Sequence, residues 1–274
     1  MGSVCVEVAV LDDRRLLDTL DSLCAQSRLP DRVLIAASTA TPEGLIEEAR
    51  RHCDRIPFDV ARFAGGVVEA RAGSLRLLRE DTTVFLDSDE RAPPDWLGRI
   101  VAPVESGEGA FSGGPTRPAR PPEGSIERYY DLLEKSIYDD VVPRSLSYLP
   151  LQNTAWKTSV LQSLGFDTRI RFAEDHDLET RALRSGARGV FVPEAFVYHD
   201  KTNETSLFRW ARKRYRYLVA MAMSLMKNGG LRGRFEERRR PVRHPLRYLE
   251  AMMKPVALVD ASVRWRRIRS RDPH

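Results

Sequence analysis

The stretch TTVFLDSDERAPPDW, residues 82–96, decides the fold of this chain. Its first half is an apolar run typical of a buried strand, and it leads directly into two aspartates separated by one serine at 87–89. The proline pair at 93–94 ends the extended segment and suits the first turn of a helix, which we predict at 93–104. Ligands of open α/β sheets bind at the carboxyl ends of strands, which is where these two acids lie.

Strand and helix patterns alternate on both sides of this stretch. β-Branched runs predict strands at 4–11, 31–38, 58–64 and 82–87, and leucines at helical spacing predict helices at 14–27, 41–53, 67–80 and 93–104. Further helices are predicted at 123–138, up to Gly165, and from about Glu174 to near Gly186, followed by strands in GVFVPE and AFVYH. This alternation predicts an α/β fold: a mostly parallel wound sheet with helices on both faces.

The composition is that of a globular protein. Of the 274 residues, 42% are hydrophobic, which is enough for a sizeable core. Cys5, Cys24 and Cys53 have no metal-type spacing and suggest a reducing compartment. We see no secretory signal and no apolar run of the ~18–20 residues that a membrane span needs. These features predict a cytoplasmic protein, bound peripherally, if at all, to the inner face of the membrane.

The net charge of +5 is unevenly distributed. Residues 1–200 carry 24 Lys and Arg against 33 Asp and Glu, whereas residues 201–274 carry 20 against 6. We therefore predict a catalytic domain at 1–204 and a basic, amphipathic helical extension at 205–274. Such an extension is either a solvated surface or a binding surface for an anionic partner: membrane lipid, nucleic acid or a phosphorylated substrate.

The acids after the strand at 82–87 suit a divalent cation. Asp87 and Asp89 offer hard carboxylate oxygens, which Mg²⁺ and Mn²⁺ prefer. Such ions commonly take their remaining ligands from substrate phosphates, so the pair fits a nucleotide diphosphate. The alternative interpretation is a polar turn, in which aspartate is common.

A second group of acids, in AEDHDL at 173–178, begins a predicted helix. Glu174, Asp175 and Asp177 have an ordinary role there, because acids complement the helix dipole. The same positive helix end keeps a carboxylate ionised, as a general base must be. Glu174 and Asp177 share a face, so we expect Asp175 to face a cleft. His199, at the end of the last predicted strand, is either a surface residue or a metal ligand.

The order of these segments over residues 4–200 resembles the family 2 glycosyltransferases of the GT-A fold. The most specific part is G-F-D at 165–167, E-D-x-D-L at 174–178, R-x-x-x-x-G at 181–186 and V-P-E-A-x-V-x-H at 192–199. The resemblance implies an inverting hexosyltransferase that moves a sugar from a nucleotide-diphospho-sugar to an acceptor hydroxyl or phosphate, with Mn²⁺ or Mg²⁺ as cofactor.

The resemblance also implies roles for single residues on the donor side. Asp87 and Asp89 form the D-x-D motif that holds the metal and the diphosphate, with Ser88 between them at the donor. His199 matches a histidine that is an extra metal ligand in some members. Arg71, in EARAGSL, matches an arginine near the nucleotide.

On the acceptor side, Asp175 matches the catalytic base that deprotonates the acceptor hydroxyl. Asn153 and Trp156 lie in the segment that borders the acceptor and the donor sugar, and we assign Glu174 and Asp177 to the same side. These assignments come from the resemblance and not from the spacing of the residues.

The chain departs from the family at the nucleotide pocket. The second strand is followed by LIAASTATPE, without the aspartate that contacts the base in many members. Asp12 or Asp13 is expected to take part of that donor-binding role, the alternative being a solvated turn. These losses keep open a non-catalytic scaffold that binds membrane or nucleic acid, and a sugar nucleotidyltransferase is the other alternative.

The basic extension bears on the acceptor. Its first helix carries apolar residues near one stripe and basic residues largely off it: Leu207, Ala211, Leu218, Ala222 and Leu225 against Arg209, Arg212, Lys213 and Arg216. Such a helix either lies at an anionic membrane surface or covers the catalytic domain. Membrane contact fits a lipid-linked acceptor or a cell-surface glycan precursor. Nucleic acid is a weaker partner, because it gives the sheet-edge acids no role.

Overall fold

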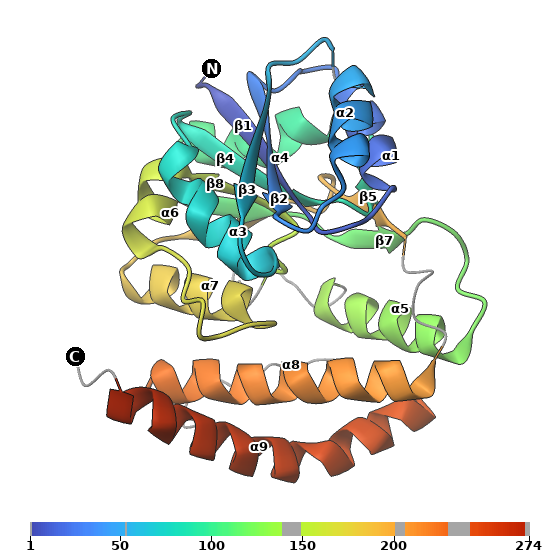
Figure 1. Cartoon of the computed structure of the whole chain (residues 1–274), viewed down its shortest axis with the longest axis vertical. Coiled ribbons are helices and arrows are strands. Elements are labelled where there is room, and N and C mark those ends of the chain that lie inside the picture. Colours follow the sequence, from blue (N-terminus) through green and yellow to red (C-terminus); the bar gives the residue numbers. More distant parts are fainter. Residues whose placement is uncertain (1, 53, 139–148, 201–205, 230–241, 272–274) are drawn as a thin grey trace.

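The computed structural model describes residues 2–52, 54–138, 149–200, 206–229 and 242–271. A seven-stranded sheet lies at the centre, in the order β3-β2-β1-β4-β8-β6-β9 (Figure 1). Its strands are β1 Val4–Val10, β2 Arg32–Ser38, β3 Phe58–Phe63, β4 Thr82–Asp87, β6 Phe111–Gly113, β8 Asn153–Lys157 and β9 Gly189–Phe191. Neighbouring strands are parallel except at β8, which is antiparallel to both β4 and β6.

Alternation along the strands gives the sheet a hydrophobic core on each face. Val4, Val6 and Val8 of β1 pack on one face, whereas Cys5 belongs to the opposite core. The first face is covered by α1 Leu16–Cys24, α2 Glu43–His52 and α4 Trp96–Glu105. The second is covered by α3 Val67–Ser74 with the 3₁₀ turn Leu75–Leu77, α6 Thr158–Leu164 and α7 Glu174–Arg184. Two covered faces explain the continuous apolar strands.

A second, three-stranded sheet joins distant parts of the chain. β10 Val197–His199 lies between β5 Glu90–Arg91, to which it is antiparallel, and β7 Thr116–Pro118, to which it is parallel. β10 lies within the strand predicted in AFVYH, but its pairing with β5 and β7 was not predicted, because strands of two or three residues carry no readable alternation. The small sheet places the end of β10 beside the turn that follows β4.

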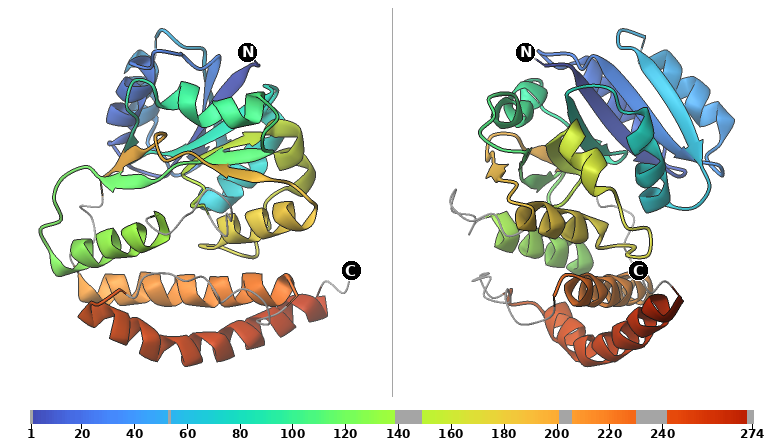
Figure 2. Two further views of the ribbon diagram at one scale, coloured as in Figure 1. Left: turned by 180° about the vertical axis from the view of Figure 1, so that it is seen from behind. Right: turned by 90° about the vertical axis from the view of Figure 1, so that its left-hand side faces the viewer.

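Three long helices form the layer below the sheets: α5 Ser125–Tyr138, α8 Leu207–Lys227 and α9 Pro245–Arg271. Two views show α8 between α9 and the rest of the molecule (Figures 1 and 2). Trp210 of α8 is completely buried and meets Tyr129 of α5 edge to face, with ring centroids 5.7 Å apart. Ala220 of α8 packs with Ile170 and Ala173 below α7. The first helix of the extension therefore covers the sheet-containing part.

The predicted fold class is confirmed, and most predicted elements are present with shifted ends. The helix predicted at 67–80 is shorter, because regular helix stops at Ser74. The prolines at 93–94 precede α4 instead of starting it, since Trp96 donates its backbone N–H to the Pro93 carbonyl at 3.0 Å. The predicted apolar stripe of α8 is wrong at Leu207, which is 53% exposed. The division at 204–205 falls outside the described residues and stays a prediction.

Candidate active site

The two predicted acid pairs approach each other at one edge of the central sheet. Asp87 is the last residue of β4 and lies in register with Ala9 of the parallel strand β1. Ser88 and Asp89 form the turn to β5, and the small sheet brings β10 against that turn. Asp200 donates its backbone N–H to the Asp89 carbonyl at 3.0 Å.

The same pairing places His199 beside Asp89, 110 residues away in sequence. The Nε2 atom of His199 lies 3.2 Å from Oδ2 of Asp89. Its Nδ1 atom is buried, has no hydrogen-bond partner and lies 3.9 Å from Oε1 of Glu90. The carboxyl group of Glu90 is fully buried, and burial together with the charges of Asp87 and Asp89 raises its pKa well above the usual value.

Arg15 is a further cation at this edge, and the sequence analysis missed it. Its guanidinium lies 3.4 Å from Oδ2 of Asp89, is held by Asp13 at 2.9 Å and donates to the carbonyl of Asp200. Burial opposes ionisation of Asp89, but the hydrogen bond with His199 and the charges of His199 and Arg15 outweigh it and lower the pKa of Asp89. Asp89 is therefore an anion at neutral pH. The arginine pair after Asp12-Asp13 was the available signal.

Arg71 connects the sheet edge to the acids of α7. Its side chain is 6% exposed, and its Nη2 atom lies 2.6 Å from Oδ1 of Asp87. Its Nη1 atom lies 3.5 Å from Oε1 of Glu174, and the guanidinium sits 5.7 Å from the centre of the Phe85 ring. Burial disfavours the charge, yet the carboxyl groups of Asp87, Glu174 and Glu7 raise the pKa of Arg71. The predicted donor-side arginine thus touches both acid groups.

The first turn of α7 carries two neighbouring acids, Glu174 and Asp175. Burial and the neighbouring charge of Asp175 raise the pKa of Glu174 to about 7. Asp175 is half-buried, and its Oδ1 accepts the backbone N–H of His176 at 2.7 Å. Phe172, just before this turn, is 44% exposed and has a positive φ of 74°.

Glu7 is a buried acid behind this site, and the sequence analysis did not single it out. It lies on β1, faces α3 because it alternates with the apolar Val6 and Val8, and accepts a hydrogen bond from Ser74 at 2.7 Å. Burial raises its pKa from 4.5 to about 7, against the charge of Arg71. One acid inside the β-branched run VCVEVAV was the signal that could have found it.

Replacing Glu7 with Gln is expected to flatten the pH dependence of stability. A folded-state pKa raised from 4.5 to about 7 means that the folded protein binds more protons than the unfolded chain between these values. The free energy of unfolding therefore falls as pH rises through this window, by about 3 kcal/mol for Glu7 alone. Urea unfolding at several pH values measures the slope. The exposed control Glu47→Gln should keep the wild-type slope, and an unchanged slope in Glu7→Gln would contradict the assignment.

Asn153 and Trp156 lie in the core, which corrects their assignment to the sugar. Asn153 is 1% exposed, accepts from Nε1 of Trp96 at 2.8 Å and donates to the carbonyls of Pro115 and Ala195. Trp156 is fully buried and stacks on Phe111, with ring centroids 4.3 Å apart. These side chains hold strands and loops together and present no surface to a sugar.

Asp177 also has structural partners. It is fully buried, and its carboxylate oxygens accept from Arg181, Lys227 and Asn228, each at 2.9 Å. These bonds tie α7 to the end of α8. Asp12 lies exposed on the loop after β1, near the carboxyl ends of the strands. The contacts described for Arg15 are with Asp13, Asp89 and Asp200 and do not include Asp12.

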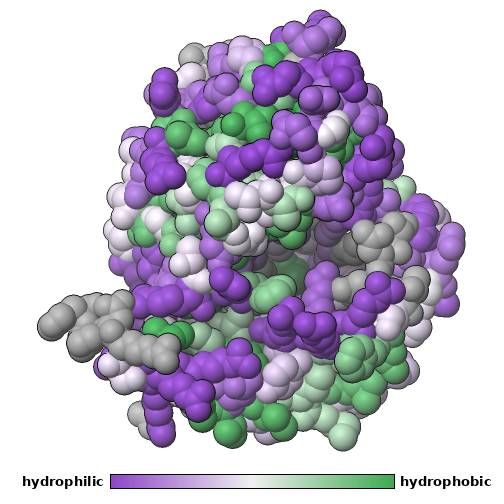
Figure 3. Space-filling view, viewed as in Figure 1, coloured by the Kyte–Doolittle hydropathy of each residue, from purple (hydrophilic) through white to green (hydrophobic). Residues whose placement is uncertain are grey.

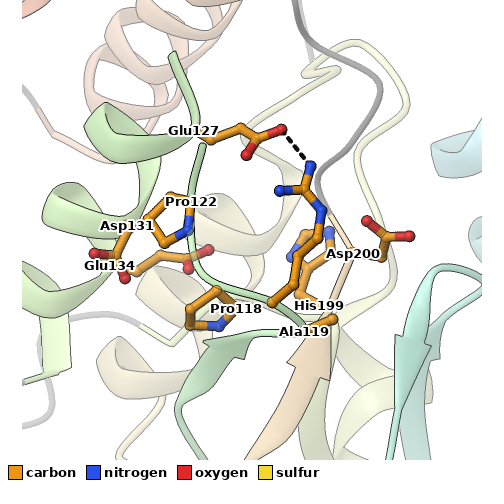
Figure 4. A pocket seen from close by; sticks show the side chains of 9 residues that line it. Pro118, Ala119, Pro122, Glu127, Asp131, Glu134, His199 and Asp200 are labelled. Carbon is orange, nitrogen blue, oxygen red and sulfur yellow. Dashed lines mark hydrogen bonds and ion pairs between the residues drawn. The ribbon is translucent and has the colours of Figure 1, made fainter. Parts of the chain in front are cut away.

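A pocket opens beside His199, on the side of α5. Figure 4 shows the acids Glu127, Asp131 and Glu134 of α5 on one side of this pocket and His199 on the other, with Asp200 beyond His199. One of these acids, Glu127, is paired with Arg120 at 2.9 Å. On the view of Figure 3 the surface is hollowed between the sheet-containing part above and α8 below. The space beside His199 itself is small, about 20 Å³, which is enough for one or two water molecules.

The donor atoms fit a cation that is shared with a substrate. Within the described ranges, no group of three or more His, Cys, Asp or Glu side chains is arranged to hold a metal ion. Asp89 and His199 nevertheless bring a carboxylate oxygen and a ring nitrogen to one point. The carboxylate suits either Mn²⁺ or Mg²⁺, whereas the ring nitrogen suits an ion like Mn²⁺, and phosphate oxygens would complete the set. Asp87 is engaged by Arg71, 2.6 Å away.

The wound sheet, the acids at its edge and the acids of α7 define an α/β protein of the GT-A glycosyltransferase fold. More narrowly, the model of a family described as glycosyltransferase like family 2 matches residues 4–219. Because the match covers well over half of the chain, the protein belongs to this family. The family and enzyme class predicted from the sequence are thus confirmed at the level of the family.

Curated relatives carry related names. Pre-mycofactocin glycosyltransferases of two Mycobacterium tuberculosis strains, CDC 1551 and H37Rv, are each 28% identical over 191 residues. The aligned part is 67% of this chain and 40% of each relative, so the chain spans well under half of their length.

Solved structures share the fold at low identity. The mannosyltransferase PcManGT of Pyrobaculum calidifontis, in complex with GDP-Man and Mn²⁺, superposes with a TM-score of 0.65 and 19% identity, covering 96% of this chain and 74% of that one. S. aureus TarS 1–349, in complex with UDP-GlcNAc, gives 0.59 and 17%, covering 96% and 72%. M. tuberculosis glucosyl-3-phosphoglycerate synthase gives 0.58 and 16%, covering 83% and 80%.

Proposed function

We propose that this protein is a metal-dependent, inverting glycosyltransferase that moves a sugar from a nucleotide-diphospho-sugar to an acceptor hydroxyl or phosphate. The observation that carries the proposal is the junction made by Arg71, which lies 2.6 Å from Asp87 of the D-x-D motif and 3.5 Å from Glu174 of the E-D pair. One buried cation thus connects the groups expected to hold the donor with those expected to activate the acceptor.

On the donor side, Asp89 and His199 would hold a divalent cation together with the diphosphate, with Asp87 beside them. When bound, that cation stabilises the charge on the departing diphosphate. Relatives of the fold support this assignment, because PcManGT and glucosyl-3-phosphoglycerate synthase have been solved with Mn²⁺ and with GDP-Man or UDP. Their nucleotides differ, and the nucleotide of this chain stays open.

On the acceptor side, Asp175 would take the proton from the acceptor hydroxyl. The acceptor oxygen then forms a bond to the anomeric carbon while the bond from that carbon to the diphosphate oxygen breaks, and a nucleoside diphosphate leaves. One displacement of this kind inverts the anomeric carbon. Positioning of the hydroxyl and the base in one cleft supplies much of the rate.

The acceptor we propose is a lipid-linked molecule or a cell-surface glycan precursor. The excess of positive charge in residues 201–274, with 20 basic and 6 acidic groups, supports contact with an anionic membrane.

A thermal-shift screen tests the donor site. UDP-, GDP-, ADP-, CDP- and dTDP-sugars are each added with and without Mn²⁺ or Mg²⁺. A donor at 100 times its dissociation constant adds about 2.7 kcal/mol, which raises Tm by a few degrees. We expect one nucleotide to act, only with metal, and the shift to vanish in Asp89→Ala. The exposed control Asp18→Ala should respond like the wild type.

Other results would point to the rival functions. A shift that survives in Asp89→Ala, or no shift with any donor, would contradict the proposed donor site and favour a binding scaffold. Release of pyrophosphate instead of a nucleoside diphosphate in a turnover assay would identify a nucleotidyltransferase.

A further inference from the structure

Helix α9 carries apolar side chains on two opposite faces. Its inner face packs on α8 through Ala257 and Ala261, which are 2% and 0% exposed. The outer face is defined here by five residues, Tyr248, Met252, Val256, Val259 and Val263. These residues follow one another at spacings of four, four, three and four. Such spacing forms a single stripe along a helix.

The α9 outer face has no partner within the described part of the chain. Tyr248, Met252, Val256 and Val259 are 72%, 73%, 61% and 66% exposed, and Val263 is 43% exposed. At 1.5 Å per residue the stripe is about 22 Å long. Single exposed apolar residues are ordinary, but a continuous stripe marks an interaction surface. Figure 3 shows hydrophobic groups along the lower edge of the molecule, where α9 lies.

The charges around the stripe are positive. Arg266, Arg267 and Arg269 are exposed in the turns that follow it. Both acids of the helix are already paired: Glu250 is 2% exposed and lies 2.9 Å from Arg214, and Asp260 is bound by its neighbour Arg264 at 2.8 Å. The surface therefore offers apolar area and cationic groups, with its carboxylates neutralised.

The helix is bowed, and the stripe follows the convex side. Figure 1 shows the concave side of α9 turned toward α8. Pro255, in the middle of the helix, lacks the N–H that would bond to residue 251 and so permits the bend. A flat partner would meet Met252 and Val256 first.

We propose that the α9 outer face inserts into the interface of an anionic lipid bilayer, with the helix lying in the membrane plane. Apolar side chains enter the acyl boundary, the Tyr248 ring suits the head-group level, and the arginines reach phosphate groups. None of the helices in the described ranges is both apolar enough and long enough to span a bilayer.

Charge decides between a bilayer and a second copy of this chain. Two copies meeting through this face would bring their basic surfaces together without carboxylates to complement them. Anionic head groups supply the missing negative charge. This proposal rests on the proposed function in one respect: membrane binding would bring the enzyme to a lipid-linked acceptor. Binding to lipid can be measured without measuring sugar transfer, so the two proposals can fail separately.

Vesicle flotation tests the insertion with the full chain. Vesicles of phosphatidylcholine alone are compared with vesicles of equal parts phosphatidylcholine and phosphatidylglycerol. We expect the wild type to float with the anionic vesicles. The double variant Met252→Gln/Val256→Gln should bind them about tenfold or more weakly, because it loses two apolar side chains that the bilayer would bury. The matched control Leu11→Gln/Leu29→Gln changes exposed leucines elsewhere and should bind like the wild type.

Further measurements keep the outcomes distinct. Arg266→Gln/Arg267→Gln/Arg269→Gln should lose the preference for anionic vesicles. The altered side chains are exposed, so Tm should stay within a degree or two in every variant. Wild type that remains unbound, or a Met252→Gln/Val256→Gln protein that floats normally, would overturn the proposal. A lipid-free dimer that this variant converts to a monomer would assign the face to a second copy. Donor-induced thermal shifts report separately on the transferase site.

Discussion

An Asp175→Asn protein is expected to fold normally and bind donor, while its kcat for sugar transfer falls by roughly 10²- to 10⁴-fold. The amide keeps the shape of the carboxylate and can still accept the N–H of His176, but it cannot take a proton. Steady-state kinetics with the donor found by thermal shift measure the effect. Asp18→Asn, an exposed aspartate in the first turn of α1, is the matched control.

The neighbouring acid makes this test more informative. Glu174 has a pKa raised to about 7 and contacts Arg71, so it is the other group in reach of a proton-transfer role. A Glu174→Gln protein separates the two. If Asp175→Asn transfers sugar at the wild-type rate and Glu174→Gln does not, the base is Glu174 and our assignment is wrong.

Replacing Arg71 with Met is expected to cost about 3–5 kcal/mol of stability, the usual penalty when one partner of a buried ion pair is removed. Arg71 lowers the pKa values of Glu7, Asp87 and Glu174, each of which burial raises. Without the guanidinium those pKa values rise further, so the folded protein binds still more protons and stability falls more steeply with pH. The loss should therefore be larger at pH 8 than at pH 5.

Urea unfolding at the two pH values measures the effect of Arg71→Met. The exposed Arg79→Met on the loop before β4 should stay within about 0.5 kcal/mol of the wild type. Arg71→Lys keeps the charge but cannot reach two carboxylates in the same planar manner, and we expect it to recover only part of the loss. A loss below 1 kcal/mol at both pH values would show that Arg71 does not neutralise this cluster.

The central sheet could be predicted because its information is local. β4 has the predicted bounds, Thr82–Asp87, since a short apolar run followed by acids is readable in one segment. The small sheet could not, because His199 meets Asp89 across 110 residues through strands of two and three residues. Arg15 was missed for the same reason.

Burial was the other property that the sequence hid. Asn153 and Trp156 lie in a motif-bearing segment, yet both satisfy their polar atoms inside the core. A polar residue in a motif can be there for the fold alone. In α9, apolar residues lie on two opposite faces, so the sequence shows no single apolar face. Only the structure shows that α8 covers one of these faces and leaves the other exposed.

The antiparallel strand β8 has a consequence for synthesis of the chain. It lies between β4 and β6 although it is made after both, so β6 has no neighbour to join until residue 157 has left the ribosome. β1 to β4 can assemble earlier by parallel pairing, which leaves the apolar edge of β4 without a partner for about seventy residues of translation. Unpaired strand edges attract other chains. This interval is therefore where a nascent chain most needs protection, and slow codons between β4 and β8 would lengthen it.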